Sequence, residues 1–121
     1  MNKIFFIILL FTSLTARSED WGLVSTDNSL KIFLSNEKTI TKKGKKLFKV
    51  KSIFNDYRDL MGLKYNLAIN LYVISCELDL LDYKQQFAFN NDELIWTFPG
   101  STKAEKASIE IPKKVLEQIC Q

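Results

Sequence analysis

Two cysteines constrain the fold of this chain more than any other feature of its sequence. Cys76 and Cys120 are the only cysteines among its 121 residues. In an oxidising compartment such a pair is expected to form a disulfide. In the chain-entropy model, closing the loop between them stabilises the domain by about 4 kcal/mol, which is comparable with the whole net stability of many small domains. We therefore expect a single domain whose C-terminus is tied covalently to its middle.

The N-terminus predicts export to such a compartment. Lys3 precedes an unbroken apolar run over residues 4–11, and the small residues Ala16 and Ser18 follow it. A basic start, a short apolar core and a small-residue exit are typical of a cleaved secretory signal peptide. A bilayer span needs about 20 apolar residues, so a retained transmembrane helix is the less favoured alternative. We predict a signal peptide at residues 1–18 and one domain at residues 19–121, with cleavage after residue 15 or 16 left open.

The mature chain is expected to be soluble and not an integral membrane protein. No cysteine stands next to the predicted cleavage site, where a bacterial lipoprotein would carry its lipid. Loss of the signal peptide removes Lys3 and Arg17 and no acid, which lowers the formal net charge from +3 to +1. We expect the protein in the periplasm, at the cell surface or secreted.

The first half of the mature chain predicts two β-hairpins. Apolar segments at residues 21–24 and 30–34 flank a cluster of polar, turn-forming residues. Gly44 can take the positive φ of a second tight turn, which joins residues 39–41 to the next strand. That strand alternates between an apolar face and a wet face that carries Lys49 and Lys51.

The second half of the mature chain predicts a β-meander. The most apolar stretch, residues 71–80, indicates a central strand whose inward face includes Cys76. Glu77 and Asp79 are expected on its other face, paired across the sheet with lysines such as Lys49 or Lys51. Residues 58–64, which precede this stretch, are expected to form an exposed connection. Two more strands are predicted, near residues 83–89 and 94–98, joined by a turn at residues 90–92.

The C-terminus predicts a helix. Pro112 suits a first helical turn, and Val115, Leu116, Ile119 and Cys120 then fall on one stripe at helical spacing. No strong period covers residues 102–108, whose conformation is left open. The predicted fold is therefore α+β and mainly β: a twisted antiparallel meander sheet with a C-terminal helix packed on one face and tethered by the disulfide.

The order of these features resembles the surface-adhesin protein E family, small exported proteins of Gram-negative bacteria. The resemblance covers nearly the whole mature chain. It rests on five short segments and the terminal cysteine: Trp21-Gly22-Leu23-Val24, the hairpin around Gly44, Asp56-Tyr57, the strand that leads to Cys76, and Trp96-Thr97-Phe98-Pro99-Gly100-Ser101 followed by a helix ending at Cys120. The resemblance implies an antiparallel sheet with a tethered C-terminal helix, and attachment to host extracellular-matrix or serum proteins. The sequence departs from the family in the short turn at residues 89–92 and in the added stretch at residues 102–110.

A lysine-rich segment offers the candidate binding surface. No acidic residue lies within this segment. The residues assigned to the surface are Lys42, Lys43, Lys45, Lys46, Lys49 and Lys51. Their positive potential could attract an acidic protein, a sulfated glycan or anionic lipid. The alternative is that these lysines keep hairpin turns and strand edges soluble. Trp21, Trp96, Phe54 and Phe87 are expected in the core rather than at a ligand.

The sequence favours a binding protein over an enzyme. It contains no histidine, no glycine-rich phosphate loop, no metal-spaced ligand cluster and no Gly-x-Ser-x-Gly motif, so we predict no catalytic residue, metal or cofactor. A glycosidase-like pair of Glu77 and Asp79 is the weaker alternative. Export argues against nucleic acid. Two functions stay open: a surface or secreted adhesin-like binder, and a periplasmic protein that binds or inhibits another envelope protein. A homodimer through an uncovered sheet edge is also left open.

Overall fold

The structure is a computed structural model that describes residues 20–37, 39–40 and 43–120. The predicted signal peptide and Lys42 lie outside the described residues. The elements, in chain order, are β1 (Trp21–Thr26), β2 (Leu30–Ser35), β3 (Thr39–Ile40), β4 (Lys46–Leu60), β5 (Leu63–Ser75), β6 (Leu80–Asn90), β7 (Glu93–Thr97), β8 (Glu105–Lys106), α2 (Ala107–Glu110) and α3 (Lys113–Ile119).

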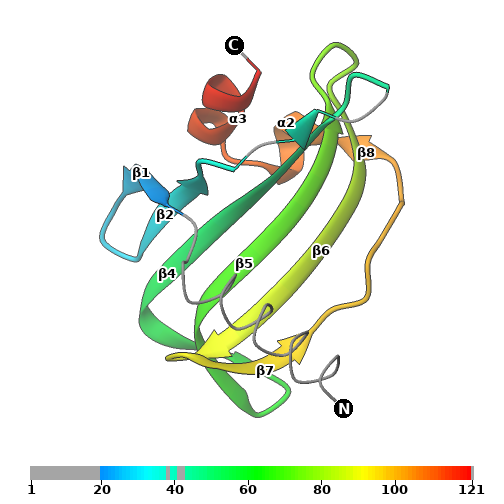
Figure 1. Ribbon diagram of the computed structural model, residues 1–121. Helices are drawn as coiled ribbons and strands as arrows, with labels where there is room; N and C mark the ends of the chain where they lie inside the picture. Colours follow the sequence, from blue (N-terminus) through cyan, green and yellow to red (C-terminus); the bar gives the residue numbers. More distant parts are fainter. Residues whose placement is uncertain (1–19, 38, 41–42, 121) are drawn as a thin grey trace, which may run out of the picture.

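The strands form one antiparallel sheet in the order β1-β2-β4-β5-β6-β7, with β3 beside β4 and β8 beside β6 (Figure 1). Neighbours in the sheet are almost all neighbours in the sequence, which is the arrangement of a meander. The two long central hairpins, β4 with β5 and β5 with β6, carry most of the sheet. The predicted fold class, a mainly antiparallel sheet with a short C-terminal helix, is confirmed.

Residues 58–64 are largely exposed, as expected, but they form the end of a hairpin with a two-residue turn instead of a longer connection between β4 and β5. β4 continues to Leu60 and β5 begins at Leu63. Both turn residues have positive φ, 52° at Met61 and 85° at Gly62, as a type I′ hairpin turn requires. The usual residue at the first position of such a turn is asparagine or glycine. Because methionine occupies that position here, the residue types do not predict the turn.

The strand that leads to Cys76 is shifted from its predicted position. β5 ends at Ser75, and residues 76–79 form the turn into β6 instead of continuing the strand to residue 80. Asp79 has a φ of 51° and accepts hydrogen bonds from the Ser108 backbone N–H at 2.9 Å and from its hydroxyl at 2.6 Å. Glu77 and Asp79 therefore do not lie on the strand face from which pairing with Lys49 or Lys51 was expected. Asp79 instead fixes the start of α2.

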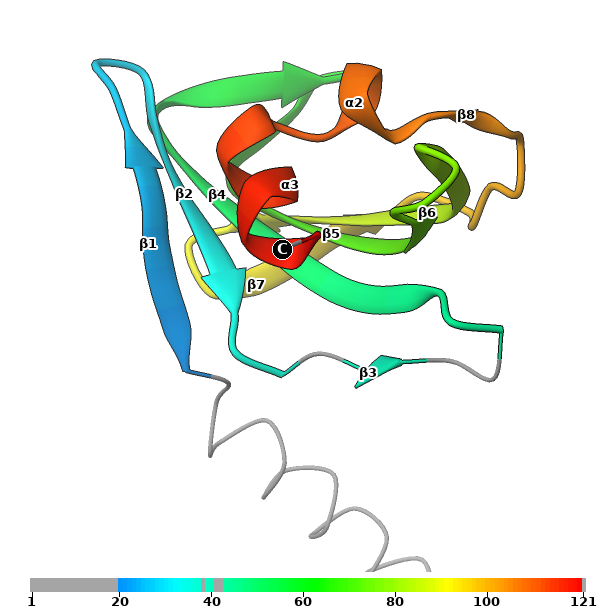
Figure 2. The ribbon, with the colours of Figure 1, turned by 90° about the horizontal axis from the view of Figure 1, so that it is seen from above.

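The core lies between one face of the sheet and the two helices, which both cover that face (Figure 2). Phe48 and Ile74 of the sheet are fully buried, as are Val115 and Ile119 on the predicted apolar stripe of α3. The Phe48 and Tyr72 rings lie 5.6 Å apart. Burial raises the pKa of Tyr72 to about 12, with the Glu110 charge as a smaller cause. The tethered C-terminal helix is thus an integral part of the core.

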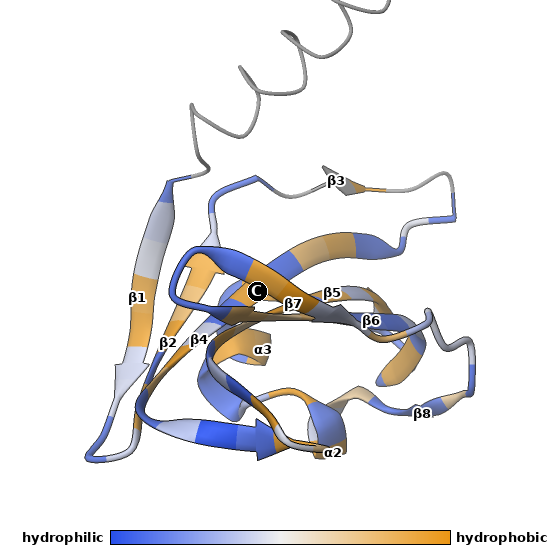
Figure 3. Ribbon diagram, turned by 90° about the horizontal axis from the view of Figure 1, so that it is seen from below, coloured by the Kyte–Doolittle hydropathy of each residue, from blue (hydrophilic) through white to orange (hydrophobic). Residues whose placement is uncertain are grey.

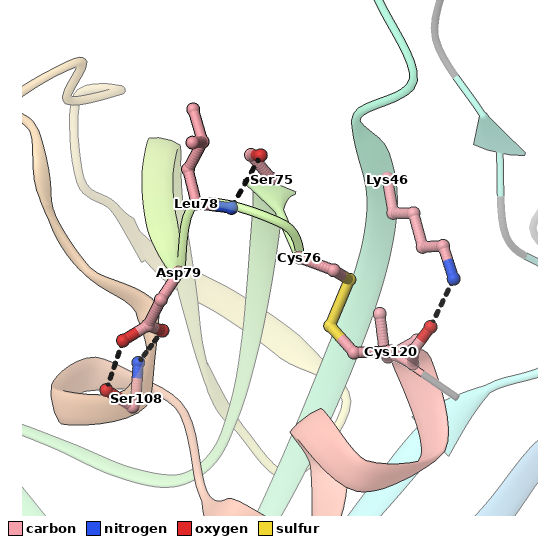
Figure 4. Close-up of a disulfide and its surroundings, with 8 residues drawn as sticks. Lys46, Ser75, Cys76, Leu78, Asp79, Ser108 and Cys120 are labelled. Atoms are coloured by element: carbon pink, nitrogen blue, oxygen red, sulfur yellow. Dashed lines mark hydrogen bonds between the residues drawn. A yellow bond between two sulfur atoms is a disulfide. The ribbon is translucent and has the colours of Figure 1, made fainter.

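The predicted disulfide between Cys76 and Cys120 is confirmed, with Cα atoms 5.5 Å apart (Figure 4). It closes a separation of 44 residues and joins the turn after β5 to the end of α3. The Lys46 ammonium donates a hydrogen bond to the Ile119 carbonyl beside it. Cys120 itself is exposed. The bond therefore clamps the rim of the core rather than filling its centre.

Most of the stretch left open by the sequence, residues 102–106, forms an extended strap along β6, and its last two residues begin α2. Lys84 and Ser101 exchange two backbone hydrogen bonds, of 2.9 and 2.8 Å, and β8 pairs with the start of β6. Gly100 lies so close to the Tyr83 ring that a β-carbon there would overlap the phenol. The strap delivers Glu110 to Lys84, where the two side chains form an ion pair of 2.8 Å.

Replacing Lys84 with methionine is expected to lower the free energy of unfolding by about 0.5 kcal/mol at neutral pH, because the ion pair is partly exposed. The Lys84 hydrogen bond holds the pKa of Glu110 below its ordinary value of 4.5. A depressed folded-state pKa contributes stability above the ordinary value and loses it as pH falls through the folded-state pKa. Urea denaturation of both proteins from pH 7 to pH 3 should therefore show the difference shrinking below pH 4.5. A difference that grows on acidification would contradict this pairing.

Candidate binding surface

The sheet has a second face, and none of the described helices packs on it. Residues directly opposite each other on neighbouring antiparallel strands share a face. Phe48 is a core residue, so the next residue of β4, Lys49, and its neighbour on β5, Leu71, belong to the second face. One rung of this face crosses all six strands of the main sheet path: Leu23, Phe33, Lys51, Ile69, Phe87 and Thr97.

We call this second face the uncovered face. It consists of that rung together with the adjoining residues Trp21, Lys31, Lys49, Ile53, Leu67, Leu71 and Phe89. Most of its side chains are half-buried, whereas Leu23 is 55% exposed. The hydropathy colours of Figure 3 show apolar segments along β1, β2 and β7. Broad apolar strand faces without a covering layer mark interaction sites in soluble proteins.

Three lysines lie within the uncovered face: Lys31, Lys49 and Lys51. Lys51 is placed by two aromatic rings, because its Nζ atom lies 4.7 Å from the Trp21 ring centroid and 5.2 Å from that of Phe33. Such cation–π contacts hold an ammonium at a fixed position. No aspartate or glutamate belongs to the uncovered face as it is defined on these described strands. The uncovered face therefore combines apolar side chains with three lysines.

The structure separates the lysines that the sequence grouped together. Lys49 and Lys51 lie on the uncovered face, while Lys46 is on the helix side of the sheet, against the end of α3. Lys45 forms an ion pair of 2.5 Å with Asp82. Lys43 is exposed in the turn before β4. Among the described lysines of the predicted surface, Lys46 is thus separated from Lys49 and Lys51 by the sheet.

Sequence reasoning missed the apolar part of this surface and one of its lysines. Trp21 and Phe87, expected in the core, lie on the uncovered face, and Trp96 is 37% exposed on β7. Lys31 belongs to the surface because β2 pairs with β4, which a strand pattern does not reveal. One signal was available: residues 67–74 are apolar at nearly every position, as in strands that cover both faces with apolar side chains.

Another candidate site lies on the helix side of the sheet. It is a cavity of about 340 Å³ between β6, the strap and α2, and its lining includes Lys84, Phe98, Glu105 and Glu110. Its central charges already neutralise each other, since Lys84 and Glu110 form the ion pair described above. Among the described residues there is no cluster of three or more side chains suited to a metal ion. The uncovered face is therefore the stronger candidate.

Comparisons with protein-family models, with curated proteins and with solved structures found no match to this chain. The fold places the protein in a broad class: a mainly antiparallel β domain whose C-terminal helix is tied by a disulfide. The disulfide is consistent with an exported protein. In the part of the chain that the structure describes, no helix has the length and apolar character needed to cross a membrane.

Proposed function

We propose that this chain is an exported binding protein that uses the uncovered face to hold an acidic segment of a partner protein. One observation carries the proposal: an acid-free apolar face whose central lysine, Lys51, is positioned by the rings of Trp21 and Phe33. Positive charge attracts and orients an acidic partner, and the apolar rung contributes the desolvated contact area that gives affinity.

The resemblance to the surface-adhesin protein E family supports a partner in the host matrix or serum. The disulfide is consistent with an exported protein, because disulfides persist in oxidising compartments outside the cytoplasm and stabilise small domains. The added strap at residues 102–110 lies along β6, on the opposite side of the sheet path from β1 and β2. It therefore does not lie over Lys31, Lys49 or Lys51.

The variant Lys49→Glu/Lys51→Glu is expected to weaken attachment to a matrix protein by at least about tenfold, because both substitutions place acids against an acidic partner. The measurement is binding of the disulfide-bonded mature protein to wells coated with basement-membrane matrix, at two salt concentrations. Attachment of the unaltered protein should also weaken as salt rises.

The control is Lys113→Glu/Lys114→Glu, which changes the net charge equally but at two exposed residues of α3, on the other side of the sheet. This control should bind like the unaltered protein. Equal losses of attachment in both variants would mean that overall charge, and not the uncovered face, causes the effect. If the unaltered protein does not attach at all, the matrix is not its partner.

Location decides between the two exported roles. Protease added to intact cells should digest a C-terminally tagged copy if the protein is a surface binder. Protection until the outer membrane is broken would favour the periplasmic alternative, in which the acidic partner is another envelope protein. Mass spectrometry of the same material should find a mature chain that starts at residue 19.

A further inference from the structure

The β4–β5 hairpin ends in an exposed apolar tip. β2 pairs with β4 only as far as Phe54, and β6 pairs with β5 only from Leu67 onward, so the hairpin extends beyond both neighbours. Met61 in its turn is 88% exposed, the highest value among the exposed large apolar residues of the described chain. Leu63 and Tyr57 nearby are 39% and 53% exposed. We call Tyr57, Met61 and Leu63 the hairpin tip.

Methionine is an energetically unfavourable residue at the tip for two reasons. Met61 has a φ of 52°, a conformation that glycine or asparagine adopts far more readily. Its side chain also leaves an apolar surface in water, where a polar turn residue would cost nothing. A strained backbone and an exposed apolar side chain at one protruding position are two separate indications that the tip has a contact to make.

The surroundings of the tip are acidic. Asp56, Asp59, Asp92 and Glu93 are exposed there, against the two bases Arg58 and Lys64. Asn66 and Tyr57 hydrogen-bond Asn91 of the next turn, which brings residues 92–93 to the same end of the molecule. The Gly62 N–H lowers the pKa of Asp59, with Lys64 as the second cause, so this carboxylate stays ionised.

The hairpin tip and the uncovered face are complementary in both charge and polarity. The tip is apolar with a net negative surround, and the uncovered face is apolar with three lysines and no acid. Figures 2 and 3 show the end of β4 curling toward the side of the sheet that carries α2 and α3. The tip of one molecule therefore points away from its own uncovered face, and only another molecule can bring the two together.

We infer that the hairpin tip docks on the uncovered face of a second copy of this chain. The two surfaces differ, so the contact is head-to-tail and leaves a tip and a face unused at the ends. Such contacts build open chains of copies rather than a closed dimer. The inference rests on the uncovered face being a docking surface, as in the proposed function, and it makes a second copy a competitor of the partner protein.

Sedimentation of the disulfide-bonded mature protein tests this inference. Its average mass should rise with concentration between about 10 μM and about 1 mM at low salt, pass that of a dimer, and fall as salt is added. Met61→Asn should weaken association by at least about tenfold while folding normally, because asparagine suits the positive φ of the turn. A mass that stays monomeric throughout, a closed dimer, or an unchanged Met61→Asn variant would overturn the inference.

A charge exchange sharpens the test. Asp56→Lys/Asp92→Lys reverses the surround of the tip, and Lys49→Glu/Lys51→Glu reverses the face. Each variant alone should remain monomeric, because like charges then oppose each other at every contact. Their mixture should associate again, because each tip meets a face of opposite charge. A mixture that stays monomeric, although both single variants fail to associate, would overturn the docking geometry.

Binding to the matrix separates this inference from the proposed function. Met61→Asn should attach to matrix normally and lose only self-association, while Lys49→Glu/Lys51→Glu should lose both. Self-association without matrix attachment would refute the proposed partner alone. Matrix attachment by a strictly monomeric protein would refute the second copy alone. If the monomer instead binds phosphatidylcholine vesicles through Met61, the tip is a lipid contact and the inference is wrong.

Discussion

Replacing both cysteines with alanine is expected to lower the free energy of unfolding by about 4 kcal/mol. The bond closes a separation of 44 residues, so its loss restores most of the conformational freedom of the unfolded chain between Cys76 and Cys120. In the folded state the bond also fixes the end of α3, whose Val115 and Ile119 fill the core. Urea denaturation at neutral pH measures the difference, and reduction of the native bond should reproduce it.

The matched control for the cysteines is Leu78→Ala, in the turn that holds Cys76. Leu78 is 70% exposed, so its truncation should change stability by no more than about 0.5 kcal/mol. A cysteine variant that loses no more than this control would mean that the tie contributes little and that the helix is held by packing alone.

Ile74→Ala is expected to cost about 3 kcal/mol, because the side chain is fully buried between the sheet and the helices. Ile69→Ala on the same strand should cost only about 1 kcal/mol. Ile69 belongs to the uncovered face and is half-buried, so water can enter the space that its truncation leaves. Both isoleucines lie on β5 and both are replaced with alanine, so the comparison isolates the face of the sheet on which each side chain lies.

Denaturant unfolding of the two variants therefore tests which face carries the core. Similar losses of more than about 3 kcal/mol in both would mean that a further layer covers the second face. That result would withdraw the uncovered face as a binding surface in the isolated protein. A large loss at Ile74 alone would support it.

The hairpins, the terminal helix and the disulfide could be predicted from residue patterns, because each depends on contacts or periods within a short stretch of chain. Alternation identified an apolar face of β4 opposite Lys49 and Lys51, and the structure agrees, because Phe48 and Val50 on that face are buried. Helical spacing likewise identified Val115 and Ile119 as buried. The tight turn at Met61 was not predicted, because such turns are recognised by asparagine or glycine at the first position and this one has methionine.

The candidate surface depended on tertiary structure. The sequence by itself determined which side chains oppose each other along a single strand, the two cysteines to be joined and the apolar stripe of the last helix. Only the tertiary structure decided that β2 pairs with β4 and in which register the strands align, and so that Lys31, Lys51 and Phe87 share a face while Lys46 turns to the helix. The physical reason is that a strand's period of two is local, whereas the register between strands, the irregularity in pairing between Ile53 and Arg58 and the side covered by the helices are set by packing of the whole chain.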